Sequence, residues 1–287
     1  MKEQFSIVSV NGLRMYVRSA GEGPAVLLMH GFPDTHVVWR KQVGPLVRAG
    51  YRVIAPDLRG YGQSDAPEAV SAYRIEHICA DMLALLDVLG IERARVVGHD
   101  WGALAGWLLC VEAPERVEQY VALSVGHPAA LARAGIQQHL RSSYMLWFMT
   151  PVLAEKALMA GDFYAMQHFT SERSQVMHWR RDLREPGRMT AALNYYRANV
   201  PRGLALGGKV DQVTVPVMGI WSDRDPALTE AQMRDSARYV TAAFRYERIE
   251  GADHWLQLTA ADRVNALLLD FFASLPQSAA AKACTTA

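Results

Sequence analysis

Residues 98–102, with the sequence GHDWG, carry the clearest chemical signal in the chain. They follow the apolar stretch ARVV and precede a run of apolar residues at helical spacing. Glycines on both sides of the central position allow a strained strand-to-helix turn that exposes one side chain, here Asp100. We therefore interpret Asp100 as a nucleophile. The alternative is an ordinary turn in which Asp100 only caps the helix.

An aspartate in this position restricts the substrate to an electrophilic saturated carbon. A serine that attacked such a carbon would form an ether, which water does not cleave. The carboxylate of Asp100 would instead form an ester, and water can open an ester at its carbonyl. The residue type thus predicts an epoxide or an alkyl halide as the substrate.

Two further segments supply partners for this nucleophile, each directly after a predicted strand. His254 is the predicted general base, and Asp225 is the predicted acid that orients its imidazole. The order nucleophile, acid, histidine is the one expected for a nucleophile on such a turn. Asp223 competes with Asp225 for the role of the acid, and His254 taken alone could be an ordinary loop histidine.

The segment HGFP at 30–33 follows the first buried strand and predicts a loop that approaches the nucleophile. The backbone N–H groups of Phe32 and Trp101 are the predicted oxyanion hole for the ester's tetrahedral intermediate. We also predict that the Phe32–Pro33 peptide bond is cis. The alternative for this segment is a plain turn.

The elements that must position these residues alternate between strand and helix. Asn11 and Gly12 predict a two-residue hairpin turn at the start of the chain. Apolar runs then predict a mostly parallel sheet with helices between its strands. Strands are predicted at 5–10, 13–17, 25–29, 51–55, 94–97, 117–123, 215–221 and 244–249, and helices at 37–49, 75–89, 103–111, 230–239 and 262–272.

From 127 to 208 the sequence predicts several helices and no strand. We therefore divide the chain into a first core segment, 1–126, a helical cap, 127–208, and a second core segment, 209–276. The small polar residues of 277–287 predict a disordered tail.

Composition excludes several classes of function. The formal net charge is +1, with 30 basic and 29 acidic residues, which gives no electrostatic case for nucleic acid or an anionic membrane surface. Three widely spaced cysteines indicate neither disulfides nor a metal site. No signal peptide, membrane helix or nucleotide-binding glycine motif is recognised, so we expect a cytoplasmic protein without a cofactor. A homodimer is left open.

These residues resemble the epoxide hydrolases of the α/β-hydrolase superfamily. The similarity extends from about residue 5 to 273 and is strongest at 30–67, at VGHDWGALAG and at ADHWLQ. It implies an α/β-hydrolase fold, with a mostly parallel eight-stranded sheet and an inserted all-helical cap. It also implies conversion of a small apolar epoxide and water to a vicinal diol, through an ester on the aspartate.

The resemblance further implies that two cap tyrosines hold the epoxide oxygen. The segment YMLWF matches a Tyr-x-Leu-x-Phe motif and assigns this role to Tyr144, and LNYYR assigns it to Tyr196. Tyr195 points about 100° away on a helix and is expected in the wall or the core. The predicted substrate pocket comprises Phe32, Trp101, Trp147 and Tyr195.

Two alternatives to an epoxide hydrolase remain open at this point. The same branch holds haloalkane and haloacid dehalogenases, which usually carry Asn in place of Phe32 or Arg in place of Trp101 and Leu104. Trp101, Trp147 and Trp179 nevertheless offer indole donors for a halide. The second alternative is a non-catalytic ligand receptor that keeps the pocket.

Overall fold

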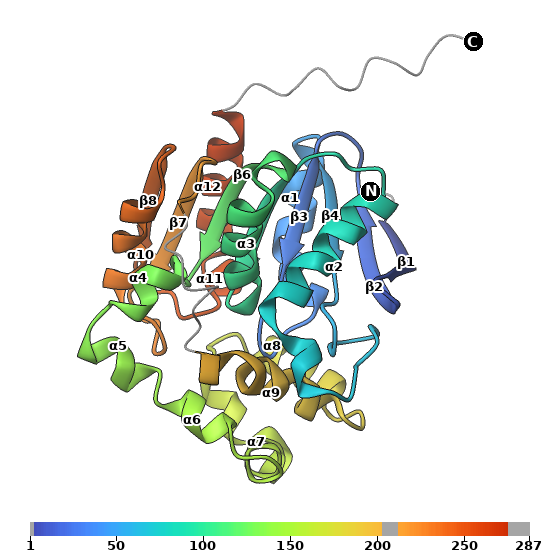
Figure 1. The fold of residues 1–287 in the computed structure, drawn as a ribbon, viewed down its shortest axis with the longest axis vertical. Coiled ribbons are helices and arrows are strands. Elements are labelled where there is room, and N and C mark those ends of the chain that lie inside the picture. Colours follow the sequence, from blue (N-terminus) through green and yellow to red (C-terminus); the bar gives the residue numbers. More distant parts are fainter. Residues whose placement is uncertain (1–2, 203–211, 275–287) are drawn as a thin grey trace.

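The computed structural model describes residues 3–202 and 212–274, and an eight-stranded sheet runs through its centre (Figure 1). The strand order is β1-β2-β4-β3-β5-β6-β7-β8. The six neighbouring strands β4, β3, β5, β6, β7 and β8 run parallel, and β2 pairs antiparallel with both β1 and β4. The predicted mostly parallel sheet is confirmed. The strands are β1 Glu3–Val10, β2 Leu13–Ala20, β3 Ala25–Met29, β4 Arg52–Pro56, β5 Ala94–His99, β6 Val117–Leu123, β7 Val217–Ser222 and β8 Phe244–Ile249.

The predicted hairpin joins β1 to β2 through Asn11 and Gly12. Both residues have positive φ angles, 47° and 77°, as a type I′ turn requires. Val10 pairs with Leu13 directly across the turn. The local sequence therefore determines the register of this pair of strands.

Two layers of helices cover the sheet (Figure 1). Helices α1 and α12 pack against each other, and α2 packs against α3, which lies over β5 and β6. Every residue of β3 and β5 is buried, as expected for central strands covered on both sides. The core helices are α1 Arg40–Arg48, α2 Ile75–Val88, α3 Trp101–Glu112, α10 Glu230–Arg234, α11 Leu256–Thr259 and α12 Ala261–Ala273.

Some predicted helices differ from those observed. The predicted helix at 37–49 is a 3₁₀ turn, His36–Trp39, followed by α1. The N–H of Val38 donates to the carbonyl of Thr35 at 3.0 Å, the three-residue spacing of a 3₁₀ turn. The helix expected at 230–239 is likewise α10 followed by a 3₁₀ turn, Asp235–Tyr239. Helix α11 was not predicted, since its four residues are too few for a periodic signal.

The segment between β6 and β7 contains helices and no strand in the residues that the structure describes there. Helix α4 packs against α10 of the core, whereas α6 and α7 pack against α9. The cap boundary at 127 stays a prediction, and the boundary at 208 and the tail 277–287 lie outside the described residues. These helices are α4 Pro128–Ala132, α5 Ile136–Arg141, α6 Tyr144–Phe148, α7 Leu153–Phe163, α8 Arg173–Leu183 and α9 Arg188–Asn199.

No helix in the described part of the chain combines the length and the apolar character needed to cross a membrane.

Candidate active site

Asp100 occupies the turn between β5 and α3 in a backbone conformation that side chains rarely adopt. Its φ and ψ angles are 53° and −120°. A β-carbon at Gly98 would collide with the backbone of α3 at Gly102, and one at Gly102 would collide with the carbonyl of Met29. Only glycines fit on both sides of this turn, which explains the pattern that predicted it.

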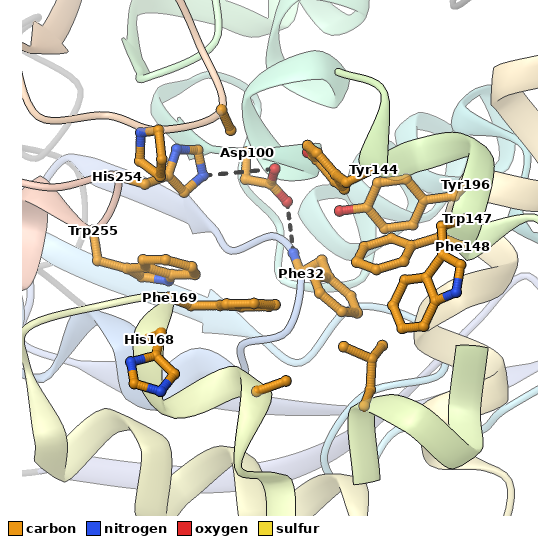
Figure 2. Close-up of a pocket in the computed structure, with 14 residues that line it drawn as sticks. Phe32, Asp100, Tyr144, Trp147, Phe148, His168, Phe169, Tyr196, His254 and Trp255 are labelled. Carbon is orange, nitrogen blue, oxygen red and sulfur yellow. Dashed lines mark hydrogen bonds and ion pairs between the residues drawn. The ribbon is translucent and has the colours of Figure 1, made fainter. Parts of the chain in front are cut away.

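The carboxylate of Asp100 is held from two sides (Figure 2). The N–H of Phe32 donates to Oδ1 at 2.7 Å, and Nε2 of His254 lies 3.7 Å from Oδ2. Burial by itself would raise the pKa of Asp100, but the contacts with His254 and the N–H of Trp101 hold it below its ordinary value. Asp100 is therefore ionised at neutral pH. The cis Phe32–Pro33 bond is confirmed.

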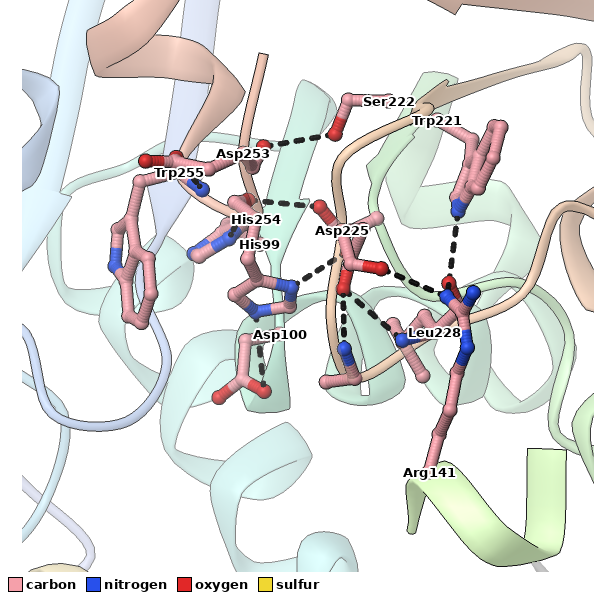
Figure 3. Close-up of polar contacts among 12 residues, drawn as sticks. His99, Asp100, Arg141, Trp221, Ser222, Asp225, Leu228, Asp253, His254 and Trp255 are labelled. Carbon is pink, nitrogen blue, oxygen red and sulfur yellow. Dashed lines mark hydrogen bonds and ion pairs between the residues drawn. The ribbon is translucent and has the colours of Figure 1, made fainter. Parts of the chain in front are cut away.

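His254 is oriented by Asp225 (Figure 3). Nδ1 of His254 and Oδ2 of Asp225 are 2.7 Å apart, and both residues are buried. The second oxygen of Asp225 accepts from the N–H groups of Ala227 and Leu228 at 2.8 and 3.0 Å. Burial lowers the pKa of His254, but Asp225 and Asp100 outweigh it and raise the pKa to about 10. At neutral pH the imidazole is thus a cation between the two carboxylates.

Asp223, the competing acid, lies outside this arrangement. Its Oδ1 accepts from the N–H of Gly251 at 2.8 Å, and its Oδ2 lies 3.4 Å from Nη2 of Arg248. It therefore fixes the loop before His254, while Asp225 contacts the imidazole itself.

A cavity of about 390 Å³ opens onto Asp100 and His254. Its walls are mainly aromatic and aliphatic, and several of them come from the helices between β6 and β7 (Figure 2). Such an apolar pocket with a few convergent polar groups is typical of small-molecule sites. The lining residues are Phe32, Asp100, Tyr144, Trp147, Phe148, Leu158, Ala165, His168, Phe169, Tyr196, Pro226, Ala227, His254 and Trp255.

Tyr144 of α6 and Tyr196 of α9 lie together on the side of Asp100 opposite His254 (Figure 2). Their ring centroids are 6.3 Å apart. Burial raises the pKa of both phenols well above the ordinary value, and the negative charge of Asp100 adds to this effect. Both phenols therefore remain neutral hydrogen-bond donors beside Asp100.

Three of the four predicted pocket residues line the cavity or the space beside it, and one does not. Phe32 and Trp147 line the cavity, and Trp101 lines a small adjoining space with Asp100 and Tyr196. The prediction that Tyr195 lines the pocket is wrong. Its ring is fully buried and its hydroxyl donates to the carbonyl of Arg59 at 2.8 Å, because α9 turns neighbouring side chains about 100° apart. Tyr195 belongs to the core.

Asp34 is a buried acid that the sequence analysis did not single out. Its carboxylate accepts from Trp179, Trp255 and Gln175 at 2.6, 2.8 and 2.7 Å. Burial raises its pKa to about 7 in spite of these donors. The sequence shows Asp34 directly after Pro33, but it does not show the donors. These come from α8 and from Trp255, and they reach Asp34 only in the folded chain.

His168 and Phe169 also line the cavity without having been predicted. They lie at the end of a 3₁₀ turn, Ala165–His168, and just after it. This short turn has no periodic pattern that points a face inward. Within the described residues, no group of His, Cys, Asp and Glu side chains could hold a metal ion.

Comparison with known proteins places the chain in a family. A family model described as alpha/beta hydrolase fold matches residues 24–261. The chain is 35% identical to an AB hydrolase superfamily protein of Bacillus subtilis, YfhM, over 92% of this chain and 96% of that protein. It is 34% identical to epoxide hydrolase A of Mycobacterium tuberculosis, over 94% of this chain and 97% of that protein.

A solved structure agrees with these relatives. Epoxide hydrolase A from Mycobacterium thermoresistibile superimposes with a TM-score of 0.84 and 31% identity, covering 96% of this chain and 100% of that chain. This chain therefore belongs to the α/β-hydrolase superfamily and, within it, to the epoxide hydrolase family.

Proposed function

We propose that this protein hydrolyses a small apolar epoxide to a vicinal diol through a covalent ester on Asp100. The observation that carries the proposal is the position of Asp100, between a pair of neutral phenols and an imidazole held by a carboxylate, in one apolar cavity. Relatives named as epoxide hydrolases over most of this chain support the same activity.

In the first step, an oxygen of the Asp100 carboxylate attacks an epoxide carbon. The carbon–oxygen bond of the ring breaks and its electron pair passes to the epoxide oxygen. Tyr144 and Tyr196 donate hydrogen bonds to that oxygen, and one of them supplies the proton that makes it a hydroxyl. Oδ1 of Asp100 is bound by the N–H of Phe32 at 2.7 Å, whereas Oδ2 lies 3.7 Å from Nε2 of His254, so Oδ2 is the less tightly held oxygen and the attacking atom.

After the first step, the proton of the His254 imidazolium passes to the tyrosinate that was formed, which restores the phenol and leaves the imidazole neutral. In the second step, His254 takes a proton from a water molecule, which attacks the carbonyl carbon of the ester. The N–H of Phe32 lies 2.7 Å from Oδ1, and with the N–H of Trp101 it stabilises the oxyanion that forms there. The tetrahedral intermediate then collapses with cleavage of its bond to the alkyl oxygen. This oxygen takes the proton of the water-derived hydroxyl and leaves as part of the diol, so Asp100 is restored as a carboxylate and His254 as the imidazolium. Ester formation removes the charge of Asp100, so one of the influences that raise the pKa of His254 disappears when a base is needed.

The pocket supports apolar substrates without a carboxylate. Among the described residues that line the cavity, the ionisable side chains apart from Asp100 and His254 are His168 and the two tyrosines. A cytoplasmic location and a possible homodimer remain predictions.

Dehalogenation is the second candidate, because it uses the same nucleophile. The structure weakens one argument for it, since the indole N–H of Trp179 donates to Asp34 at 2.6 Å and is not free for a halide. Phe32 and Leu104 stand where the dehalogenases usually have a halide or carboxylate donor. Phenols that can transfer a proton suit an alkoxide, whereas a departing halide needs no proton.

The decisive experiment traps the intermediate. In His254→Gln, the ester forms but lacks its base, so mass spectrometry of protein incubated with styrene oxide should show an adduct on a peptide containing Asp100. The added mass equals the whole epoxide, since nothing leaves in the first step. Asp100→Ala is the control and should remain unmodified. A screen in which chloroalkanes are turned over and epoxides are not would favour the dehalogenase instead.

A further inference from the structure

The loop that carries the catalytic acid, residues 225–229, has irregular backbone and depends on side chains to satisfy its polar groups. Asp225 satisfies two of its N–H groups, those of Ala227 and Leu228. Several of the remaining groups are bound by α5, a helix from the segment between β6 and β7.

Gln138 of α5 binds this loop through both ends of its amide. Its Oε1 accepts from the N–H and the hydroxyl of Thr229 at 2.9 and 3.0 Å. Its Nε2 donates to the carbonyl of Ala227 at 2.9 Å and to Ser142 at 3.0 Å. The Gln138 side chain is buried, and both its amide oxygen and its amide nitrogen are hydrogen-bonded. Breaking these bonds costs free energy, because a buried polar group left without a partner keeps its desolvation penalty.

Arg141 lies one turn further along α5 and reaches the other end of the loop (Figure 3). Its Nη1 donates to the carbonyls of Asp225 and Leu228, both at 2.7 Å. These are charge-assisted hydrogen bonds to backbone. Gln138 and Arg141, here called the α5 clamp, thus contact the loop at four of its residues.

We propose that the α5 clamp positions Asp225 against His254 and so controls the hydrolysis step rather than ester formation. The proposal rests on the proposed function. One carboxylate oxygen of Asp225 accepts from the backbone of the loop, and the other lies 2.7 Å from Nδ1 of His254. A rotation of the loop would break that contact while leaving Asp100 and its Phe32 donor in place.

A competing role for the clamp is to anchor the cap. Tyr144 begins α6, three residues after Arg141, so release of α5 from the core could instead displace the phenol from Asp100. The two roles predict opposite kinetics. Loss of Asp225 positioning slows decay of the ester, whereas loss of Tyr144 positioning slows its formation.

The test is single-turnover kinetics with styrene oxide on Arg141→Met and Gln138→Met, following the Asp100 ester by rapid quench and mass spectrometry. We expect ester decay to slow about tenfold in each variant, with formation changed less than about twofold, so that ester accumulates. Arg141→Lys should recover part of the decay rate. Arg133→Met is the matched control, because Arg133 donates to the hydroxyl of Tyr239 and does not bind the loop.

A second measurement needs no substrate and separates failure of this proposal from failure of the proposed function. The Nδ1 proton of His254, shared with Asp225, should give a far-downfield NMR signal in the unmodified protein and in Arg133→Met. The signal should move upfield or vanish in both clamp variants. An unchanged signal, or ester formation slowed as much as its decay, would overturn the proposal.

Discussion

The core and the helices α4 to α9 between β6 and β7, called the cap here, contribute to this site in different ways. In the core, Asp100, Asp225 and His254 follow the ends of parallel strands, and their geometry is set by a strained turn and by hydrogen bonds of 2.7 Å. The cap contributes Tyr144 and Tyr196 from two helices that pack against each other. In the proposed mechanism, the core therefore supplies the nucleophile, base and acid, and the cap supplies the groups that recognise the leaving oxygen.

The difference indicates which changes should abolish the chemistry and which should redirect it. A nucleophile has no substitute, but a leaving oxygen can be stabilised by other donors. Substitutions of the residues at the strand ends should therefore reduce activity more than substitutions of the cap residues.

The largest effect is expected for Asp100→Ala. Without a carboxylate no ester can form, so kcat should fall by at least about 10⁴-fold. Diol formation from styrene oxide measures the loss, and circular dichroism checks that the fold is intact. Activity within tenfold of the unmodified protein would contradict covalent catalysis by this residue.

The cap tyrosines are expected to come next. Tyr144→Phe and Tyr196→Phe should each slow ester formation about 10-fold to 100-fold, and the double variant should lose nearly all of it, because no proton donor remains for the alkoxide. Decay of an ester once formed should change little, since His254 and Asp225 are untouched. Rapid-quench measurement of both steps separates the two regions, and slower decay with normal formation would reverse the assignment.

The base should show itself in the pH dependence of the second step. His254 must lose its proton to accept one from water, and its raised pKa of about 10 in the free protein falls when Asp100 is esterified. Ester decay should thus increase with pH and then level off, whereas ester formation should be flat over roughly pH 6 to 9 because Asp100 stays ionised. In Asp225→Asn the rise should shift to lower pH, since the charge that stabilises the imidazolium is gone. If the midpoint of the pH dependence of ester decay did not move in this variant, Asp225 would not be the partner of His254.

The smallest effect on catalysis is expected at Tyr195, the neighbour of Tyr196. Tyr195→Phe removes the hydrogen bond to the carbonyl of Arg59 and should destabilise the fold by about 1–3 kcal/mol. Turnover should stay within about twofold of the unmodified protein. Urea unfolding and diol formation measure the two quantities, and a large loss of kcat would return Tyr195 to the pocket.

The sequence by itself determined the framework. The apolar runs predicted the strands of the sheet because buried parallel strands are continuous and short. Asn11 and Gly12 predicted the hairpin, and the glycines around Asp100 predicted the turn, since both conformations depend on local sterics. The order of Asp100, Asp225 and His254 along the chain was likewise legible as a pattern.

Only the tertiary structure decided which groups meet across the cavity. It distinguished Asp225 from Asp223 through the contact with His254, and it assigned Tyr195 to the core although it adjoins Tyr196. It also brought α8 and Trp255 to Asp34, and α5 to the loop of the catalytic acid. These contacts join residues tens of positions apart or more, and no local spacing encodes them, because they depend on how the loops at the strand ends and the cap helices pack together.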